Sequence, residues 1–231
     1  MSAAPAAIIT KRGSAAELHA LEPPVSDSRE LWVLDATRPA VVLGSSQSEP
    51  DGLAVWAEAR GLDVARRRSG GGAVLVDPAQ TIWLDLLLPA ADSAHHDDLG
   101  AMFCAVGDVI ATTLRSCGLD EHGPVTVHRT RPGPEERDRD SLARRICFAG
   151  LGWGEVLIGP HKAVGLSQRR TRWGARVQVL VDLVGVNAVL ADVFAQTHAE
   201  LALIETRQRP AKSHRPPPDL NSRLEQALAT I

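Results

Sequence analysis

The sequence predicts an α+β domain in which mixed or antiparallel sheets are flanked by helices. Short apolar runs typical of strands dominate the middle of the chain, and one long amphipathic helix interrupts them. Helices fall between and after the strands without strict βαβ alternation, so a purely parallel sheet is not expected. The 231 residues, of which 44% are hydrophobic, suffice for a sizeable core.

Local patterns place the individual elements. Strands are expected at 31–34, 40–44, 62–67, 73–76, 81–88, 153–158, 163–168 and 175–181. Helices are expected at 51–60, 95–117, 192–198 and 220–229. The helix at 95–117 has the clearest signal, because apolar residues recur at three- and four-residue steps and Gly118 follows as a stop.

The chain divides into three expected regions. Residues 1–25 are predicted to be a partly flexible N-terminal segment, and residues 26–200 the main domain of the chain. Residues 201–231 are predicted to be a tail with a terminal helix. Within the domain, residues 129–142 are charged, contain Pro and Gly, and lack an apolar period, which predicts a mobile loop of the kind that often covers a site.

Composition argues against several classes of function. A net charge of −3 and a pI near 6.2 give no general case for binding nucleic acid or an anionic membrane surface. Three cysteines without a CxxC pair suggest a reduced, cytoplasmic setting. Neither a signal peptide nor a membrane span of about 18 apolar residues is expected. The histidines are not spaced like metal ligands, so no metal site is predicted.

The stretch at 66–72, with three arginines, Ser69 and the glycines Gly70, Gly71 and Gly72, is the first candidate site. Consecutive glycines let backbone N–H groups approach a ligand without an intervening Cβ. Arginines such as Arg67 can bind a carboxylate or phosphate in a bidentate manner. The alternative is a tight hairpin with solvated arginines. The spacing fits neither a P-loop nor a dinucleotide-binding fingerprint.

Lys162 is the second candidate, because it stands alone in an apolar segment punctuated by glycines. A buried lysine needs a partner, so such a residue either points outward or is held for a purpose such as binding an anion or a polarised carbonyl. Gly165 and Ser167 follow it and would let a ligand come close to the backbone. The alternative is an ordinary lysine in a β-hairpin turn.

Cys147 is the third candidate. Two arginines precede it, and positive neighbours favour the thiolate, which is the nucleophilic form. The alternative is a buried core cysteine. Cys104 and Cys117 fit that alternative better, because both lie on the predicted helix at 95–117.

Two longer motifs occur in a fixed order. Residues 66–74 read Arg-Arg-Arg-Ser-Gly-Gly-Gly-Ala-Val, and residues 162–170 read Lys-Ala-Val-Gly-Leu-Ser-Gln-Arg-Arg. They resemble the Arg-Arg-x-Ser/Thr-Gly-Gly-Gly-x-Val and Lys-Ile/Val-Ala/Ser-Gly-Ser-Ala-Gln-x-Arg motifs of the lipoate–protein ligase A family, which includes octanoyltransferases. Residues 44–47 look like that family's Gly-Arg-x-Gln turn, with Ser45 in place of Arg, and Cys147-Phe148 resembles a pair in one octanoyltransferase branch.

The resemblance implies the biotin/lipoate ligase catalytic domain fold. It implies that Lys162 holds the acyl carbonyl or adenylate phosphate and that Cys147 is a nucleophile that forms a thioester. The acyl or adenylate group would then be bound by Arg67, Ser69, Gly70, Gly71, Gly72, Gly165 and Ser167. One departure is notable: Gln178-Val179-Leu180 stands where the family usually has Gln-His-Gly.

Three functions stay open at this point. The first is transfer of an octanoyl or lipoyl group from a donor such as octanoyl-acyl carrier protein, with no tightly bound cofactor. The second is an ATP-dependent lipoate–protein ligase, which would use Mg²⁺ and lipoate. Either enzyme would modify a lipoyl carrier domain, such as glycine cleavage H protein or a 2-oxoacid dehydrogenase subunit. The third is a non-catalytic relative that binds an acyl group or a lipoyl domain.

Two observations favour the transferase. Cys147 precedes Lys162 by 162 − 147 = 15 residues, as in the transferase branch that the resemblance indicates. About 45 residues follow the matched region, which is short for the second domain that family ligases commonly use.

Overall fold

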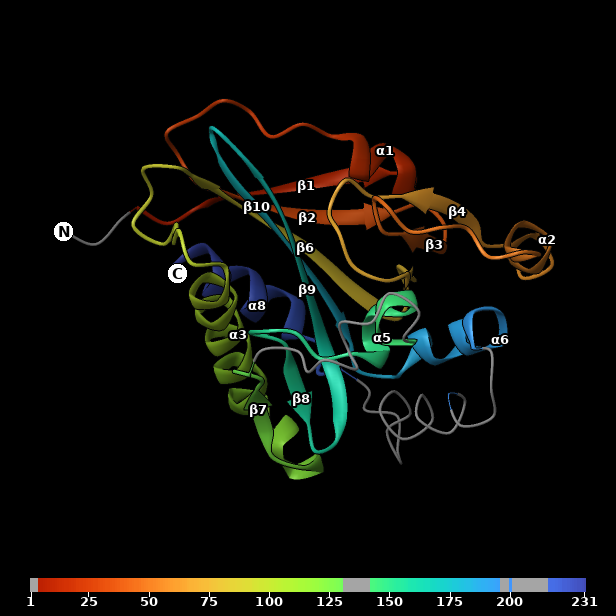
Figure 1. The fold of residues 1–231 in the computed structure, drawn as a ribbon. Coiled ribbons are helices and arrows are strands. Elements are labelled where there is room, and N and C mark those ends of the chain that lie inside the picture. The colour runs from red at the N-terminus through yellow and green to blue at the C-terminus, as the bar shows by residue number, and fades with distance from the viewer. Residues whose placement is uncertain (1–3, 131–141, 196–199, 201–215) are drawn as a thin grey trace.

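The computed structural model describes residues 4–130, 142–195, 200 and 216–231 (Figure 1). Its centre is a seven-stranded sheet of order β1-β2-β6-β10-β9-β8-β7, and a three-stranded sheet of order β4-β3-β5 lies beside it. Both sheets are mixed: β1 runs parallel to β2 and β3 parallel to β4, whereas the other described pairings are antiparallel. The predicted α+β class with mixed sheets is therefore confirmed.

The elements have the following bounds. The strands are β1 (Ala7–Gly13), β2 (Glu30–Ala36), β3 (Ala40–Leu43), β4 (Asp63–Arg66), β5 (Val74–Val76), β6 (Thr81–Pro89), β7 (Val125–Val127), β8 (Val156–Ile158), β9 (His161–Thr171) and β10 (Gly174–Asp182). The α-helices are α1 (Ala15–Ala20), α2 (Leu53–Glu58), α3 (Leu99–Ser116), α5 (Leu142–Arg145), α6 (Ala191–Phe194) and α8 (Leu220–Ala229). Short 3₁₀ turns are η1 (Leu119–His122), η2 (Cys147–Ala149) and η3 (Val186–Leu190).

The N-terminal segment is part of the main sheet. β1 pairs with β2 along its whole length, from Ala7 opposite Glu30 to Gly13 opposite Ala36. Helix α1 follows at once, and Ser14 and Glu17 form a capping box at its start. The described part of the segment predicted at 1–25 thus contributes an edge strand and a helix to the domain.

Several other boundaries differ from prediction. The helix predicted at 95–117 begins only at Leu99, because the Asp98 side chain accepts the backbone N–H of Ala101 and caps it. The strand predicted at 153–158 begins at Val156, after Gly154 takes a positive φ of 76°. The short strand β7 and helix α5 were not predicted. Most of the predicted loop at 129–142 lies outside the described residues.

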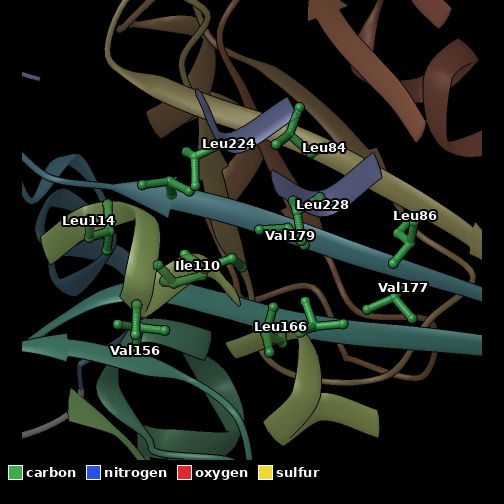
Figure 2. Packing of buried hydrophobic residues seen from close by; sticks show 14 of the residues in the cluster. Leu84, Leu86, Ile110, Leu114, Val156, Leu166, Val177, Val179, Leu224 and Leu228 are labelled. Carbon is green, nitrogen blue, oxygen red and sulfur yellow. The ribbon is translucent and has the colours of Figure 1, made fainter. Parts of the chain in front are cut away.

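One face of the seven-stranded sheet carries the main apolar core. Helices α3 and α8 lie side by side across this face (Figure 1). Figure 2 shows the contacts: Ile110 and Leu114 of α3 and Leu224 and Leu228 of α8 meet Leu84, Leu86, Val156, Leu166, Val177 and Val179 of the sheet. The predicted terminal helix is confirmed as α8, and it belongs to this core.

Among the described residues, α3 is the one helix long and apolar enough to cross a membrane by length and composition alone. Met102, Val106, Ile110 and Leu114 on its inner face are buried against the sheet. The same apolar character therefore accounts for its place as the central helix of the core.

The opposite face of the seven-stranded sheet packs against the three-stranded sheet and α1. Apolar side chains from the two sheets pack together here. They are Trp32, Trp83, Leu87 and Leu180 from the large sheet and Val42, Ala65, Val74 and Val76 from the small sheet. The far side of the small sheet is covered in turn by a third cluster that includes Leu53, Leu142, Ile146 and Phe194. The space between the two sheets is where the candidate site lies.

Candidate active site between the two sheets

The loop that carries Cys147 is attached to the glycine-rich turn. The N–H of Ala73 donates to the carbonyl of Arg145 at 2.8 Å, and the N–H of Cys147 donates to the carbonyl of Ala73 at 2.9 Å. A Cβ on Gly72 would lie 2.8 Å from the backbone nitrogen of Cys147, so a larger residue there would displace the loop. The third glycine of the motif therefore permits close approach of protein backbone.

Gln47 fixes the same loop from the other side. Its Nε2 donates to the carbonyl of Arg145 at 2.8 Å, and its Oε1 accepts the N–H of Gly44 at 3.1 Å. The turn at 44–47, singled out by resemblance, thus positions the backbone immediately before the candidate nucleophile.

Arg67 is buried and shapes the glycine turn. Its Nη2 donates to the carbonyls of Gly70 at 3.0 Å and Gly72 at 2.8 Å. Gly71, with a φ of 104°, lies between these two acceptors. Burial lowers the pKa of the Arg67 guanidinium, and the nearby Cys147 opposes that shift. Arg67 therefore holds the turn and places a positive charge close to the cysteine.

Lys162 lies beside Cys147. Its Nζ is 3.9 Å from Cys147 Sγ and donates to the carbonyls of Cys147 at 2.6 Å and Gly150 at 3.0 Å. It also sits 5.2 Å from the centre of the Phe148 ring. The lysine and the cysteine, 15 residues apart in sequence, thus form a pair in which the ammonium can stabilise negative charge on the sulfur.

Glu155 is the partner of Lys162 that sequence reasoning missed. Its Oε2 lies 2.6 Å from Lys162 Nζ, and the two side chains are only 5% and 2% exposed. The carboxylate also accepts the backbone N–H of Gly152 at 2.6 Å and that of Leu166 at 3.4 Å. These bonds offset the unfavourable burial of both charges. In the sequence, Glu155 is distinguished only as the single acidic residue of an apolar hairpin that also contains a single lysine, Lys162.

A cavity opens next to this pair. The space between its atoms amounts to about 380 Å³, open solvent at the mouth included. Its wall is formed by His19, Arg67, Val74, Val76, Trp83, Cys147, Gly165, Leu166, Ser167, Gln178, Val179 and Leu180. Aliphatic and aromatic side chains make up much of this wall, as a hydrocarbon chain requires.

Gly165 forms the part of the wall nearest to the cysteine. A Cβ at this position would lie 3.7 Å from Cys147 Sγ and 3.1 Å from the Phe148 ring. The absence of a side chain therefore leaves space beside the sulfur for an acyl group.

Polar side chains gather farther along the same wall. Ser69 Oγ donates to Gln178 Oε1 at 2.5 Å, Ser167 Oγ donates to it at 3.2 Å, and the two hydroxyl oxygens are 3.1 Å apart. Gln178 Nε2 lies 3.3 Å from His19 Nδ1 and 3.5 Å from Asp85 Oδ2. Gln178, the first residue of the triplet that stands where the family usually has Gln-His-Gly, is the centre of this group.

A buried ion pair supports the polar group. Arg176 Nε donates to Asp85 Oδ2 at 2.6 Å, and its Nη2 and Nη1 donate to the carbonyls of Leu18 and Leu21 at the end of α1. Burial raises the pKa of Asp85, while the Arg176 guanidinium opposes that rise. The pair attaches α1, and with it His19, to the large sheet.

The structure brings the predicted residues together in two ways. Arg67, Cys147, Gly165 and Ser167 line the cavity directly. Ser69 and Lys162 lie one residue farther from the cavity: Ser69 contacts Ser167, and Lys162 contacts Cys147. Gly70, Gly71 and Gly72 curve around the Arg67 guanidinium behind the wall. Across the residues that the structure describes, no group of three or more His, Cys, Asp or Glu side chains is placed to hold a metal ion.

Comparison with known proteins identifies the class of domain. The lipoyl protein ligase A/B catalytic domain matches residues 17–198, which is most of the chain. This chain therefore belongs to the lipoyl protein ligase A/B catalytic domain family. Membership in this family makes it an enzyme of the acyltransferase or ligase kind. No curated protein sequence matches it significantly.

Solved structures show the same fold at low identity. Lipoate-protein ligase A bound with ATP is 19% identical, with a TM-score of 0.65 over 97% of this chain and 82% of that chain. A bipartite lipoate protein ligase from Thermoplasma acidophilum, described with its E2 lipoyl domain, is 17% identical, with a TM-score of 0.66 over 98% and 83%. A further structure from T. acidophilum with bound lipoic acid is 16% identical, with a TM-score of 0.65 over 98% and 82%.

Proposed function

We propose that this domain transfers an octanoyl or lipoyl group onto a lysine of a lipoyl carrier domain through a thioester on Cys147. The observation that carries the proposal is the position of Cys147 Sγ, which lines the apolar cavity and lies 3.9 Å from Lys162 Nζ. A thiolate in that position has a cation beside it and room for an acyl chain next to Gly165.

The first step is formation of the thioester. The Cys147 thiolate attacks the carbonyl carbon of an acyl thioester donor, and a new carbon–sulfur bond forms. The donor's carbon–sulfur bond breaks, and its thiolate leaves and takes up the proton that Cys147 released. Lys162, held by Glu155 and two backbone carbonyls, and Arg67, held by the glycine turn, place two cationic groups near the sulfur that carries out the attack.

The second step transfers the acyl group to the carrier. The neutral amine of the carrier lysine attacks the thioester carbon, a carbon–nitrogen bond forms, and the bond to Cys147 sulfur breaks. The proton lost by the amine balances the thiolate that leaves. The domain therefore needs no cofactor for this route, only a donor such as octanoyl-acyl carrier protein and a lipoyl carrier domain.

ATP-dependent ligation is the second candidate, because lipoate-protein ligase A with bound ATP shares the fold. In that route a cation must bind the adenylate phosphate. The Lys162 ammonium is bound by the Glu155 carboxylate, and Arg67 Nη2 donates to two carbonyls. A phosphate would have to compete with these bonds, which favours the thioester route.

One experiment separates the two routes. Purified protein is incubated with octanoyl-acyl carrier protein and examined by intact mass spectrometry, and acylation of a lipoyl domain is then followed with and without ATP, Mg²⁺ and lipoate. The transferase predicts an acyl adduct that is absent in Cys147→Ala and retained in Cys104→Ala, a matched cysteine on α3 away from the cavity. Acylation that requires ATP and persists in Cys147→Ala would instead establish a ligase.

A further inference from the structure

Three charged side chains meet at the rim of the space between the two sheets. Glu22, in the loop after α1, binds Arg68 of the glycine-rich turn through one carboxylate oxygen and Arg169 of β9 through the other. The contact from Arg169 Nη1 to Glu22 Oε2 is 2.9 Å. Two guanidiniums thus share a single carboxylate, which leaves this cluster with an excess of positive charge.

Both arginines are accessible to a ligand from solvent. The side chains of Arg68 and Arg169 are 47% and 29% exposed. A guanidinium carries several N–H donors, and the bond to Glu22 uses one nitrogen of each arginine. Because exposed ion pairs are weak, an anion can bind the remaining donors without breaking a strong contact. Lys162 differs, since its ammonium is buried against a carboxylate of its own.

The cluster lies in line with the candidate nucleophile along β9. Side chains alternate along a strand, so Gly165, Ser167 and Arg169 point to the same face. A Cβ on Gly165 would lie 3.7 Å from Cys147 Sγ. At about 3.4 Å per residue, the strand advances about 14 Å between Gly165 and Arg169. A group bound by the cluster is therefore at about that distance from the sulfur.

The acyl chain has another direction available, across the strands. Leu180 pairs with Gly165, and Trp83 pairs with Leu180 on the following strand. Both apolar side chains line the cavity. Crossing from β9 to β6 takes two strand spacings, about 10 Å, and an octanoyl chain at about 1.2 Å per bond has about that length. The direction along β9 is thus left for the part of the donor that follows its sulfur.

The distance to the cluster suits a long arm better than a lysine side chain. A lysine has about five bonds between Cα and Nζ and spans about 6 Å, so it ends well short of Arg169. The pantetheine arm of acyl carrier proteins and coenzyme A has about thirteen bonds between its sulfur and its phosphorus, which span about 15 Å. The phosphate at the end of this arm, an anion, would therefore arrive at the arginines.

We propose that Arg68 and Arg169 bind the phosphate of a phosphopantetheine arm, so that the site prefers acyl donors carried on this arm. Guanidiniums suit the task, because their N–H donors match the oxygens of a phosphate. A hollow that Trp173 lines continues beyond Arg169, where the group attached to the phosphate would lie. This inference rests on the proposed function for the donor thioester at Cys147, and it assigns residues that recognise the donor.

Two probes that differ only in the phosphate test the proposal without the chemical step. Octanoyl-phosphopantetheine and octanoyl-pantetheine are titrated calorimetrically into Cys147→Ala protein, which cannot form a thioester. We expect the phosphorylated probe to bind about tenfold more tightly, since two exposed charge contacts contribute about threefold each. The ratio should approach one in about 1 M salt, where the screening length falls to about 3 Å.

Variants then assign the preference to the cluster. Arg68→Gln and Arg169→Gln should each lower the ratio about threefold, and the double variant should lower it to about one. Arg169→Lys keeps a positive charge and should retain part of the preference. Arg12→Gln is the matched control, because Arg12 is an exposed arginine paired with Asp35 on β1, which β2, β6 and β10 separate from β9. This control should preserve the tenfold ratio.

The full donors identify the source of the arm. The rate of Cys147 acylation in wild-type protein is measured by intact mass spectrometry with octanoyl-acyl carrier protein and with octanoyl-coenzyme A, each well below saturation. The faster donor supplies the arm, and its rate should fall about tenfold when both Arg68 and Arg169 are replaced by Gln. A rate that does not fall overturns the proposal.

The outcomes separate this proposal from the proposed function. Equal affinity for the two probes overturns the phosphate site, and the transferase stands if wild-type protein still forms the acyl adduct. An unchanged ratio in the double variant also overturns the site; if that variant does not fold, unchanged ratios in Arg68→Gln and Arg169→Gln do so. A ratio that depends on the two arginines, in a wild-type protein that never forms a thioester, supports the site and refutes the transferase.

Discussion

The two faces of the seven-stranded sheet differ although the same strands build both. On β10, Val177 and Val179 point into the apolar core under α3 and α8, as Figure 2 shows. Their neighbours Arg176 and Gln178 point to the other side, where they join a network of ion pairs and hydrogen bonds. Strand alternation thus separates a face that stabilises the fold from a face that carries the site.

The two faces differ in what their buried side chains require from their surroundings. The core face needs only shape and apolar area, so its residues are exchangeable among similar sizes. On the site face, buried charged and polar groups such as Lys162, Glu155 and Asp85 each require a particular partner. Substitutions on the two faces should therefore have different consequences for stability and for activity.

The largest effect is expected from separating Lys162 and Glu155. Lys162→Ala leaves the Glu155 carboxylate buried without its cation, which should lower the free energy of unfolding by about 3–5 kcal/mol and abolish thioester formation. Urea denaturation and intact mass spectrometry measure the two effects. The double variant Lys162→Met with Glu155→Gln should recover much of the stability but none of the activity; active double-variant protein would contradict the assigned role of Lys162.

A core substitution should affect stability alone. Ile110→Ala removes a fully buried side chain on α3 and should lower the free energy of unfolding by about 2–5 kcal/mol. Acyl adduct formed per folded molecule should stay at the wild-type level, because the cavity is on the other face. A selective loss of adduct in folded Ile110→Ala would show that the two faces are coupled.

Acid should destabilise the site face through His19. The folded-state pKa of about 3 lies below the ordinary value of 6.5, so only the unfolded chain takes up this proton between those values. Stability from this residue is therefore complete above pH 6.5 and is lost as the pH falls, by about 2 kcal/mol at pH 5. Denaturation curves of wild type and His19→Phe at several pH values check this; parallel pH dependences would rule it out.

The smallest effect is expected at Gly165. The added methyl of Gly165→Ala would lie 3.1 Å from the Phe148 ring and close to Cys147 Sγ, so we expect a loss of about 1–2 kcal/mol and slower thioester formation. Gly70→Ala is the matched control, because a Cβ there meets no atom within 4 Å. Thermal unfolding and the rate of adduct formation compare the two, and equal rates would show that the acyl chain does not pass Gly165.

The sequence allowed prediction of the elements whose signal is local. The helix around Ile110 has a clear apolar period, and residues 66–72 and 162–170 carry motifs that point to one family. β1 was missed because it is an edge strand with exposed and half-buried residues, although Ser14 and Glu17 do signal the helix that follows it.

The candidate site was predictable only in part, because its residues meet through tertiary contacts. Cys147, Lys162 and Arg67 could be selected by residue type and motif. Glu155 had only a weak local signal, as the single acidic residue of the hairpin that carries Lys162, and His19 had none, since nothing local shows that it lines the same cavity. Partners of buried charges emerge only once the strands have been paired.

The Cys147 backbone is joined to the small sheet by the Ala73 hydrogen bond, whereas Lys162 belongs to strand β9 of the large sheet. The 3.9 Å between their reactive atoms thus spans the junction of the two sheets, and the bond from Lys162 Nζ to the Cys147 carbonyl crosses the same junction. The relative position of the two sheets therefore sets how far the ammonium lies from the sulfur. Nucleophile reactivity is consequently tied to how the two sheets are aligned.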